Sequence, residues 1–139
     1  MNRVLLVSHG LFAEGLKDSL EMFVGAKDNI DCCILAKTED LSIFEKKLQA
    51  KLDTYDSADQ ILVLADLIGG SPLTTTMKLL ANKYASTSFK VLGGMNFAMA
   101  LSAVLNIENG LNEACEAALR EGQNALNELV LETEDEEDI

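Results

Sequence analysis

Two polar side chains that could act together follow two separate apolar runs. His9, the only histidine of the chain, follows the run Val4 to Val7, and Asp66 follows the run Ile61 to Ala65. A neutral imidazole, with an ordinary pKa of about 6.5, is a good nucleophile near physiological pH. One ring nitrogen can attack while the other donates its proton to a carboxylate, which orients the ring and stabilises positive charge on it. His9 and Asp66 therefore form a candidate nucleophilic pair.

The residues after Asp66 are typical of an anion-binding helix start. Gly69 and Gly70 permit a tight backbone path, and Ser71 followed by Pro72 predicts an N-cap with proline at the first helical position. The free N–H groups and positive dipole end of such a helix favour a phosphate or another anion. Beside a nucleophilic histidine, this pattern indicates a phosphoryl group as substrate and predicts a phosphohistidine carrier.

The elements that must position these residues alternate along the chain. Short apolar runs predict buried strands at 4–7, 30–36, 61–65 and 88–92, and apolar residues at helical spacing predict helices at 12–24, 42–55, 72–84, 97–105 and 111–122. Ser42 and Glu45 form a possible capping box for the second helix. This order predicts one α/β domain with a doubly wound, mostly parallel sheet and helices on both faces. In a parallel sheet the carboxyl ends of the strands lie at one side, so His9 and Asp66 should lie close together there. Ligands bind parallel sheets beyond these strand ends.

The carboxyl-terminal part of the sequence divides into two segments. The segment 124–131, NALNELVL, could continue the preceding helix or form a last short strand, and the pattern favours the strand. Residues 132–139 are acidic and have little to bury, which predicts a disordered tail. We therefore expect one domain over 1–131 and a tail over 132–139.

Composition limits the classes of partner and compartment. The net charge of −12 argues against nucleic acid and anionic membrane surfaces as partners. No apolar segment approaches the roughly 18 residues of a membrane span, and no signal peptide precedes the first strand, so we expect a cytoplasmic protein. The three cysteines are an odd number and indicate packing in a reducing compartment rather than a metal site. Met95 and Met99 are expected in the core.

Three motifs together resemble a known family. VSHG after the first strand, DLIGGSP after the third and GGMNFAM after the fourth are similar to the IIA component of the mannose-type (mannose, fructose, sorbose) sugar phosphotransferase system. The resemblance runs from Arg3 to about Leu131. It implies a phosphocarrier without metal or organic cofactor, in which His9 accepts a phosphoryl group from the phosphohistidine of HPr and passes it to a IIB component.

The resemblance also assigns roles to residues. It implies phosphorylation of the outer nitrogen of His9, with Asp66 orienting the ring and with Gly69, Gly70 and Ser71 around the phosphate. Ile68, Met95 and Asn96 are candidates for the partner surface, although Ile68 and Ala98 replace a frequent aromatic residue and a frequent proline of the family. The membrane components IIC and IID would be indirect partners. The implied homodimer exchanges a carboxyl-terminal strand, which corresponds to the segment 124–131.

Other functions fit part of the pattern. The phosphocarrier subunit of the dihydroxyacetone kinase system has a similar domain and would serve a kinase rather than a permease. A flavodoxin-like FMN protein fits the length and acidity, but SHGLFAEG lacks a hydroxyl-rich phosphate loop and the chain has no tryptophan. A hydrolase using Ser71, His9 and Asp66 is disfavoured because Ser71 does not lie in a G-x-S-x-G elbow.

Overall fold

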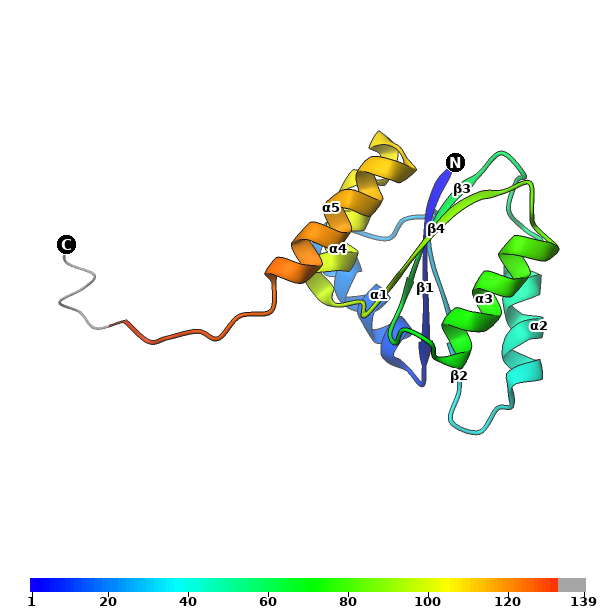
Figure 1. Cartoon of the computed structure of the whole chain (residues 1–139), viewed down its shortest axis with the longest axis horizontal. Coiled ribbons are helices and arrows are strands. Elements are labelled where there is room, and N and C mark those ends of the chain that lie inside the picture. The colour runs from blue at the N-terminus through cyan, green and yellow to red at the C-terminus, as the bar shows by residue number, and fades with distance from the viewer. Residues whose placement is uncertain (133–139) are drawn as a thin grey trace.

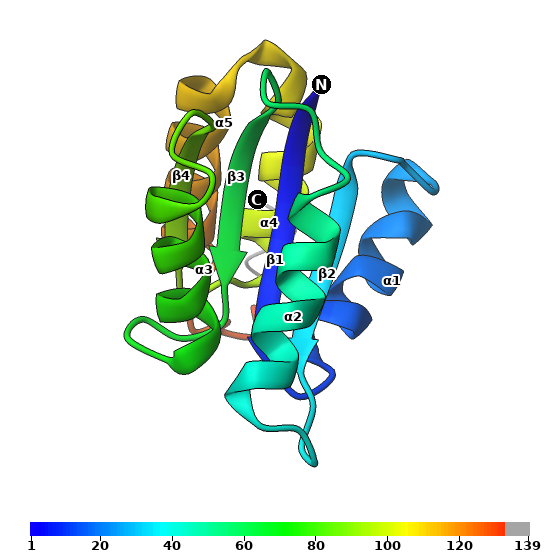
Figure 2. The ribbon, with the colours of Figure 1, turned by 90° about the vertical axis from the view of Figure 1, so that its right-hand side faces the viewer.

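A four-stranded parallel sheet forms the centre of the domain. The computed structural model describes residues 1–132, and its strands are β1 (Asn2–His9), β2 (Ile30–Leu35), β3 (Gln60–Ala65) and β4 (Ser88–Gly93). Their order across the sheet is β2-β1-β3-β4, as Figure 2 shows. The two central strands are covered on both faces, which explains why β1 and β3 are continuous apolar runs rather than alternating ones.

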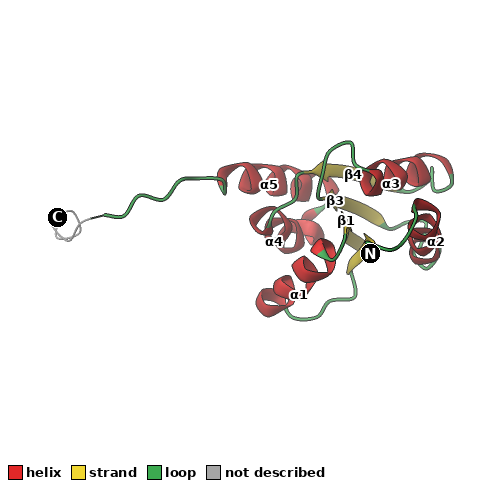
Figure 3. Cartoon of the chain, turned by 90° about the horizontal axis from the view of Figure 1, so that it is seen from below, coloured by secondary structure: helices red, strands yellow, loops and turns green. Residues whose placement is uncertain are grey.

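The helices form a layer on each face of the sheet. The helices are α1 (Phe12–Val24), α2 (Leu41–Leu52), α3 (Ser71–Asn82), α4 (Phe97–Asn106), the 3-10 helix η1 (Ile107–Asn109) and α5 (Leu111–Asn124). Helices α2 and α3 cover one face, and α1, α4 and α5 cover the other (Figures 1 and 3). The predicted doubly wound α/β domain is therefore confirmed.

Alternate residues of the central strands enter two separate hydrophobic cores. On β1, Val4 and Leu6 pack in the core beneath α1, α4 and α5, whereas Leu5 and Val7 pack in the core beneath α2 and α3. This division follows from the two-residue period of a strand. Met95 and Met99 belong to the first core, as the sequence predicts.

The register of the sheet brings the ends of β1 and β3 together. Val7 lies opposite Ala65, so the residues that follow each strand emerge at the same edge. Near the end of β1, the buried hydroxyl of Ser8 accepts a hydrogen bond from the backbone N–H of Ala13 at 2.8 Å. This contact fixes the turn from His9 into α1.

Two predicted helix starts are wrong in detail. The N-cap of α2 is Asp40, whose Oδ1 accepts from the backbone N–H of Ile43 at 3.1 Å, while the Ser42 hydroxyl donates to the same Oδ1. A carboxylate is a stronger acceptor than a hydroxyl, so Asp40 replaces the predicted capping box of Ser42 and Glu45. At α3 the cap is Gly70, and Ser71 is the first helical residue.

The predicted strand in the segment 124–131 does not form within this chain. Helix α5 extends to Asn124, and the residues from Leu126 to the end of the described chain form neither helix nor strand and run away from the domain (Figure 1). The side chains of Leu126, Leu129 and Leu131 are each at least 90% exposed. Within residues 1–132, no strand of the sheet pairs with this segment. Residues 133–139 of the predicted tail lie outside the described residues.

Candidate functional site

His9 and Asp66 meet through one oxygen of the carboxylate. Oδ2 of Asp66 lies 2.9 Å from Nδ1 of His9 and also accepts the backbone N–H of His9 at 3.0 Å. The backbone N–H of Asp66 donates to the carbonyl of Val7 at 3.3 Å, which ties the start of this loop to β1. The predicted pair is thus brought together by contacts of both side chain and backbone.

This geometry decides which ring nitrogen is free to react. A carboxylate only accepts hydrogen bonds, so the contact requires the proton on Nδ1, and the neutral ring then carries its lone pair on Nε2. The imidazole is 45% exposed, whereas the Asp66 side chain is 13% exposed. Oδ1 of Asp66 is buried and has no hydrogen-bond partner within residues 1–132. The arrangement combines an accessible ring nitrogen with a shielded carboxylate behind the ring.

The GGSP turn contributes in a different way from that predicted. Gly69 has a positive φ of 79°, a conformation that favours glycine, and Gly70 donates its N–H to the carbonyl of Leu67 at 3.3 Å. The amide of Gly70 therefore closes the turn and is not free to bind a phosphate. Ser71 is exposed at the first position of α3, and its hydroxyl makes no hydrogen bond in the described part of the chain. Ser71 and the amino terminus of α3 remain the candidate anion-binding groups.

Exposed apolar side chains follow the same two strand ends as His9 and Asp66. Leu11 and Phe12 follow β1, while Leu67 and Ile68 follow β3, and their exposed fractions range from 50% to 77%. We call these four residues the apolar rim. Of the four, the sequence analysis identified only Ile68 as a surface candidate. The signal for the others is a large apolar residue within three positions of His9 or Asp66, just beyond a strand end.

The other two predicted partner-surface residues, Met95 and Asn96, make contacts within the domain. Met95 is only 4% exposed and packs in the core, so its side chain cannot form part of a partner surface. Asn96 caps α4 by accepting from the N–H of Met99 at 2.9 Å, and its amide donates to the carbonyl of Gly122 at 3.1 Å. Asn96 thereby joins α4 to α5, and its two polar groups are already occupied.

The cysteines are packed side chains within the fold. Cys32 and Cys33 lie on β2, and burial raises the pKa of Cys33 to about 11, so that its thiol stays protonated at neutral pH. Among residues 1–132, no group of three or more His, Cys, Asp or Glu side chains is arranged to hold a metal ion. Within the same range no helix is both long and apolar enough to cross a membrane.

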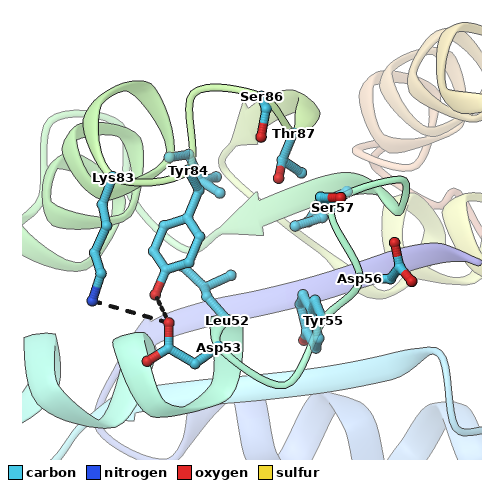
Figure 4. A pocket seen from close by; sticks show the side chains of 11 residues that line it. Leu52, Asp53, Tyr55, Asp56, Ser57, Lys83, Tyr84, Ser86 and Thr87 are labelled. Carbon is cyan, nitrogen blue, oxygen red and sulfur yellow. Dashed lines mark hydrogen bonds and ion pairs between the residues drawn. The ribbon is translucent and has the colours of Figure 1, made fainter.

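A hollow of about 170 Å³ lies at the opposite end of the strands from His9, between the carboxyl ends of α2 and α3 (Figure 4). The carboxylate of Asp53 accepts the hydroxyl of Tyr84 and lies 4.0 Å from the ammonium of Lys83. Burial and this hydrogen bond to Asp53 raise the pKa of Tyr84 to about 12. Asp53 and Lys83 in the hollow are therefore paired with each other, and the hollow is separate from the candidate site.

Comparison with known proteins finds sequence relatives that are described as components of the sugar phosphotransferase system (PTS). The family described as "PTS system fructose IIA component" matches residues 3–120. The mannose-specific EIIAB component of Escherichia coli K12 is 26% identical over 102 residues, covering 73% of this chain and 31% of that protein. The sorbose-specific EIIA component of Lacticaseibacillus casei is 26% identical over 106 residues, covering 76% and 74%. The chain thus spans about a third of the length of the EIIAB relative.

Solved structures agree with the sequence relatives. The mannose/sorbose-specific IIA subunit from Enterococcus faecalis is 30% identical with a TM-score of 0.83, covering 95% of this chain and 97% of that one. The EIIA component from Streptococcus agalactiae is 25% identical with a TM-score of 0.81, covering 92% and 97%. Because the family match spans most of the chain and the fold agrees, the protein belongs to the mannose-type EIIA family of the phosphotransferase system.

Proposed function

We propose that this chain is a phosphohistidine carrier in which Nε2 of His9 accepts a phosphoryl group and passes it on. The observation that carries the proposal is the 2.9 Å contact between Nδ1 and Oδ2 of Asp66, which leaves Nε2 unprotonated on an exposed ring. Membership of the EIIA family supports the same reaction class.

The transfer needs no cofactor from the protein. The lone pair of Nε2 attacks the phosphorus of a donor phosphohistidine, the new N–P bond forms, and the electrons of the broken N–P bond return to the donor ring. Nδ1 keeps its proton, and the positive charge that develops on the His9 ring lies beside the Asp66 carboxylate. When phosphorylated His9 is the donor, a nitrogen of the acceptor attacks the phosphorus, and the electrons of the broken N–P bond return to the His9 ring.

The start of α3 would stabilise the transferred group. Ser71 is exposed at the first helical position, and the first N–H groups of a helix have no partner inside it. These groups and the helix dipole favour the added negative charge. Gly69 contributes the tight turn that leads into this helix start.

The donor we propose is HPr, and the acceptor is a IIB component that serves the membrane components IIC and IID. The apolar rim of Leu11, Phe12, Leu67 and Ile68 offers a docking surface beside the reacting ring. The excess negative charge of the chain suits a basic partner surface and would raise the association rate. The relatives are described with mannose, sorbose and fructose, so we propose a sugar-transport role without a particular sugar.

We further infer a cytoplasmic homodimer formed by exchange of the segment 124–131. The leucines at 126, 129 and 131 are almost fully exposed in the single chain. Strand β4 is an edge strand with one side unpaired in the sheet. A segment that pairs with no strand within residues 1–132 could add to such an edge in a second copy. The domain would then extend to residue 131, with residues 132–139 as an acidic tail.

The decisive test is intact mass after incubation with phosphoenolpyruvate, enzyme I and HPr. We expect one acid-labile phosphoryl gain on the wild-type chain and none on His9→Ala. A gain that persists in His9→Ala would refute the assignment of His9. No gain on the wild type, with active upstream proteins, would refute the carrier function.

The dihydroxyacetone kinase pathway remains the second candidate because it would use the same chemistry. The two pathways are separated by the acceptor: phosphorylated protein is incubated with a IIB component or with the kinase subunits, and transfer is measured. The flavodoxin-like alternative loses support from the family membership, and the hydrolase alternative lacks a hydrogen bond between Ser71 and His9 among the described residues.

A further inference from the structure

Gly70 lies directly against the imidazole ring of His9. A Cβ atom placed on Gly70 would come within 2.8 Å of Cε1 of His9, whereas its next neighbour, the carbonyl oxygen of Leu67, would be 3.4 Å away. Carbon atoms in contact ordinarily stay about 3.5–4.0 Å apart. The ring therefore occupies the space that any side chain at position 70 would need.

Backbone conformation does not explain why a glycine stands here. Gly70 has φ −75° and ψ 159°, an extended conformation that every residue adopts. It is also the N-cap of α3, a position where Ser, Asp or Asn would serve at least as well as glycine. Gly69 shows the contrasting case, with φ 79° and no atom within 4 Å of a Cβ. The contact with the His9 ring is the remaining constraint on position 70.

The contacted atom connects this constraint to the chemistry. Cε1 is the ring carbon between Nδ1, which is bound to Asp66, and Nε2, which faces the partner in the proposed transfer. A ring displaced by a side chain at position 70 would turn away from Oδ2 of Asp66. Because His9 is 45% exposed, the ring has room to turn outward without disturbing the core.

We propose that Gly70 is a positioning residue: the absence of a side chain there allows the His9 ring to keep Nδ1 on Asp66 and so keeps Nε2 unprotonated. The inference deepens the proposed function and rests on it for its consequence in phosphoryl transfer. The ring geometry itself can be tested without any phosphoryl donor. Gly70 thus acts through His9 and not on the substrate.

The test uses Gly70→Ala with Gly15→Ala as the matched control. Gly15 lies in α1, and a Cβ there has no atom within 4 Å, so alanine should fit freely and support the helix. The ¹⁵N signals of the single imidazole report its tautomer without assignment ambiguity. We expect the Nδ1–H form in the wild type and Gly15→Ala, and a substantial Nε2–H population in Gly70→Ala.

A thermodynamic cycle shows whether the ring is the obstacle. Gly70→Ala should lower the melting temperature in the wild-type background but not in His9→Ala, because the double variant lacks the ring. An unchanged tautomer in Gly70→Ala would overturn the proposal. Loss of folding in Gly70→Ala, or an equal cost in both backgrounds, would also overturn it, since the added atom would then meet a rigid neighbour.

Kinetics separate this proposal from the proposed function. With phospho-HPr as the donor, we expect kcat to fall about tenfold or more in Gly70→Ala while KM stays unchanged, because the apolar rim is intact. A tautomer shift in a chain whose wild type accepts no phosphoryl group would support the positioning role and refute the carrier role. A normal tautomer with normal transfer would do the reverse.

Discussion

Replacement of Asp66 by asparagine removes a charge from the candidate site and changes little else in shape. Oδ2 of Asp66 lies 2.9 Å from Nδ1 of His9 and 3.0 Å from its backbone nitrogen, so an amide oxygen at the same place could still accept both hydrogen bonds. What disappears is the negative charge beside the ring that becomes positive during transfer. Asp66→Asn is therefore a test of charge rather than of packing.

Two estimates of the same loss give the size of the effect on transfer. Hydrogen bonds to charged groups are worth about 1.5–3 kcal/mol and neutral ones about 0.5–1.5, so the Nδ1 contact loses roughly 1–1.5 kcal/mol. As a charge pair, the contact would give about 4 kcal/mol at 4 Å in an effective dielectric of about 20, but the half-exposed ring reduces this to roughly 1 kcal/mol. A loss of about 1–1.5 kcal/mol corresponds to transfer that is roughly 5- to 13-fold slower.

Stability should hardly change in the same variant. Oδ1 of Asp66 is buried without a hydrogen-bond partner in the described chain, so the carboxylate already bears a desolvation cost that asparagine reduces. We expect the free energy of unfolding to stay within about 1 kcal/mol of the wild type. Urea denaturation measures this value on the same samples.

The assay is the single-turnover rate of phosphoryl transfer from phospho-HPr, followed by rapid quench and intact mass. Asp18→Asn is the control because Asp18 is exposed on α1 and gives the same change in net charge. A wild-type rate in Asp66→Asn would remove Asp66 from the mechanism. Equal slowing in both variants would show that overall charge, and not this contact, is responsible.

Further predictions concern acid stability, the partner surface, packing and assembly. Burial alone would raise the pKa of Asp59, but hydrogen bonds from the N-terminal ammonium and Arg3 outweigh it and lower the pKa to about 2. Because the pKa is lower in the folded chain, this stabilisation is complete above about pH 4 and is lost as the pH falls through 2. Asp59→Asn should cost about 2 kcal/mol at pH 7 and flatten the loss between pH 4 and 2 in urea titrations; an unchanged pH profile would contradict this. Ile68→Ser should raise KM for phospho-HPr about tenfold and leave the melting temperature nearly unchanged, since the side chain is 77% exposed; an unaltered KM would exclude Ile68 from docking. Gly93→Ala would place a Cβ 2.2 Å from Cγ1 of Ile68, so it should cost about 1–3 kcal/mol in thermal unfolding, and Ile68→Ala should relieve that cost if the reasoning holds. A chain that ends at Ala125 should be a monomer in light scattering, and a dimer of this shortened chain would refute strand exchange.

Several features of the fold could be predicted from local patterns alone. The apolar runs that became β1 and β3 are continuous because central strands of a parallel sheet are covered on both faces. The helix faces follow from spacing, and Met99 could be placed in the core from its neighbours. The pairing of His9 with Asp66 could also be predicted, because parallel strands end at a common edge.

Other features depended on competition between neighbours that a local pattern does not resolve. Asp40 caps α2 instead of Ser42 because its carboxylate, two residues earlier, accepts the N–H of Ile43. Met95 is buried in the core, as its apolar surroundings predict, although the resemblance to the family also implies a place on the partner surface. Leu126 and its neighbours have a strand-like pattern, yet they pair with no strand within residues 1–132.

The sequence by itself determined the order of strands and helices along the chain, the hydrophobic periodicity and which side chains are candidates for the chemistry, because each depends on residues close together in the chain. Tertiary structure decided which ring nitrogen of His9 is free, which amide of the GGSP turn is already bonded, and why position 70 carries no side chain. The first and the last of these properties depend on contacts of His9 with Asp66 and Gly70, which are about 60 positions away in sequence. Only the packing of β1 against β3 sets such distances, through the register that places both strand ends at one edge of the sheet.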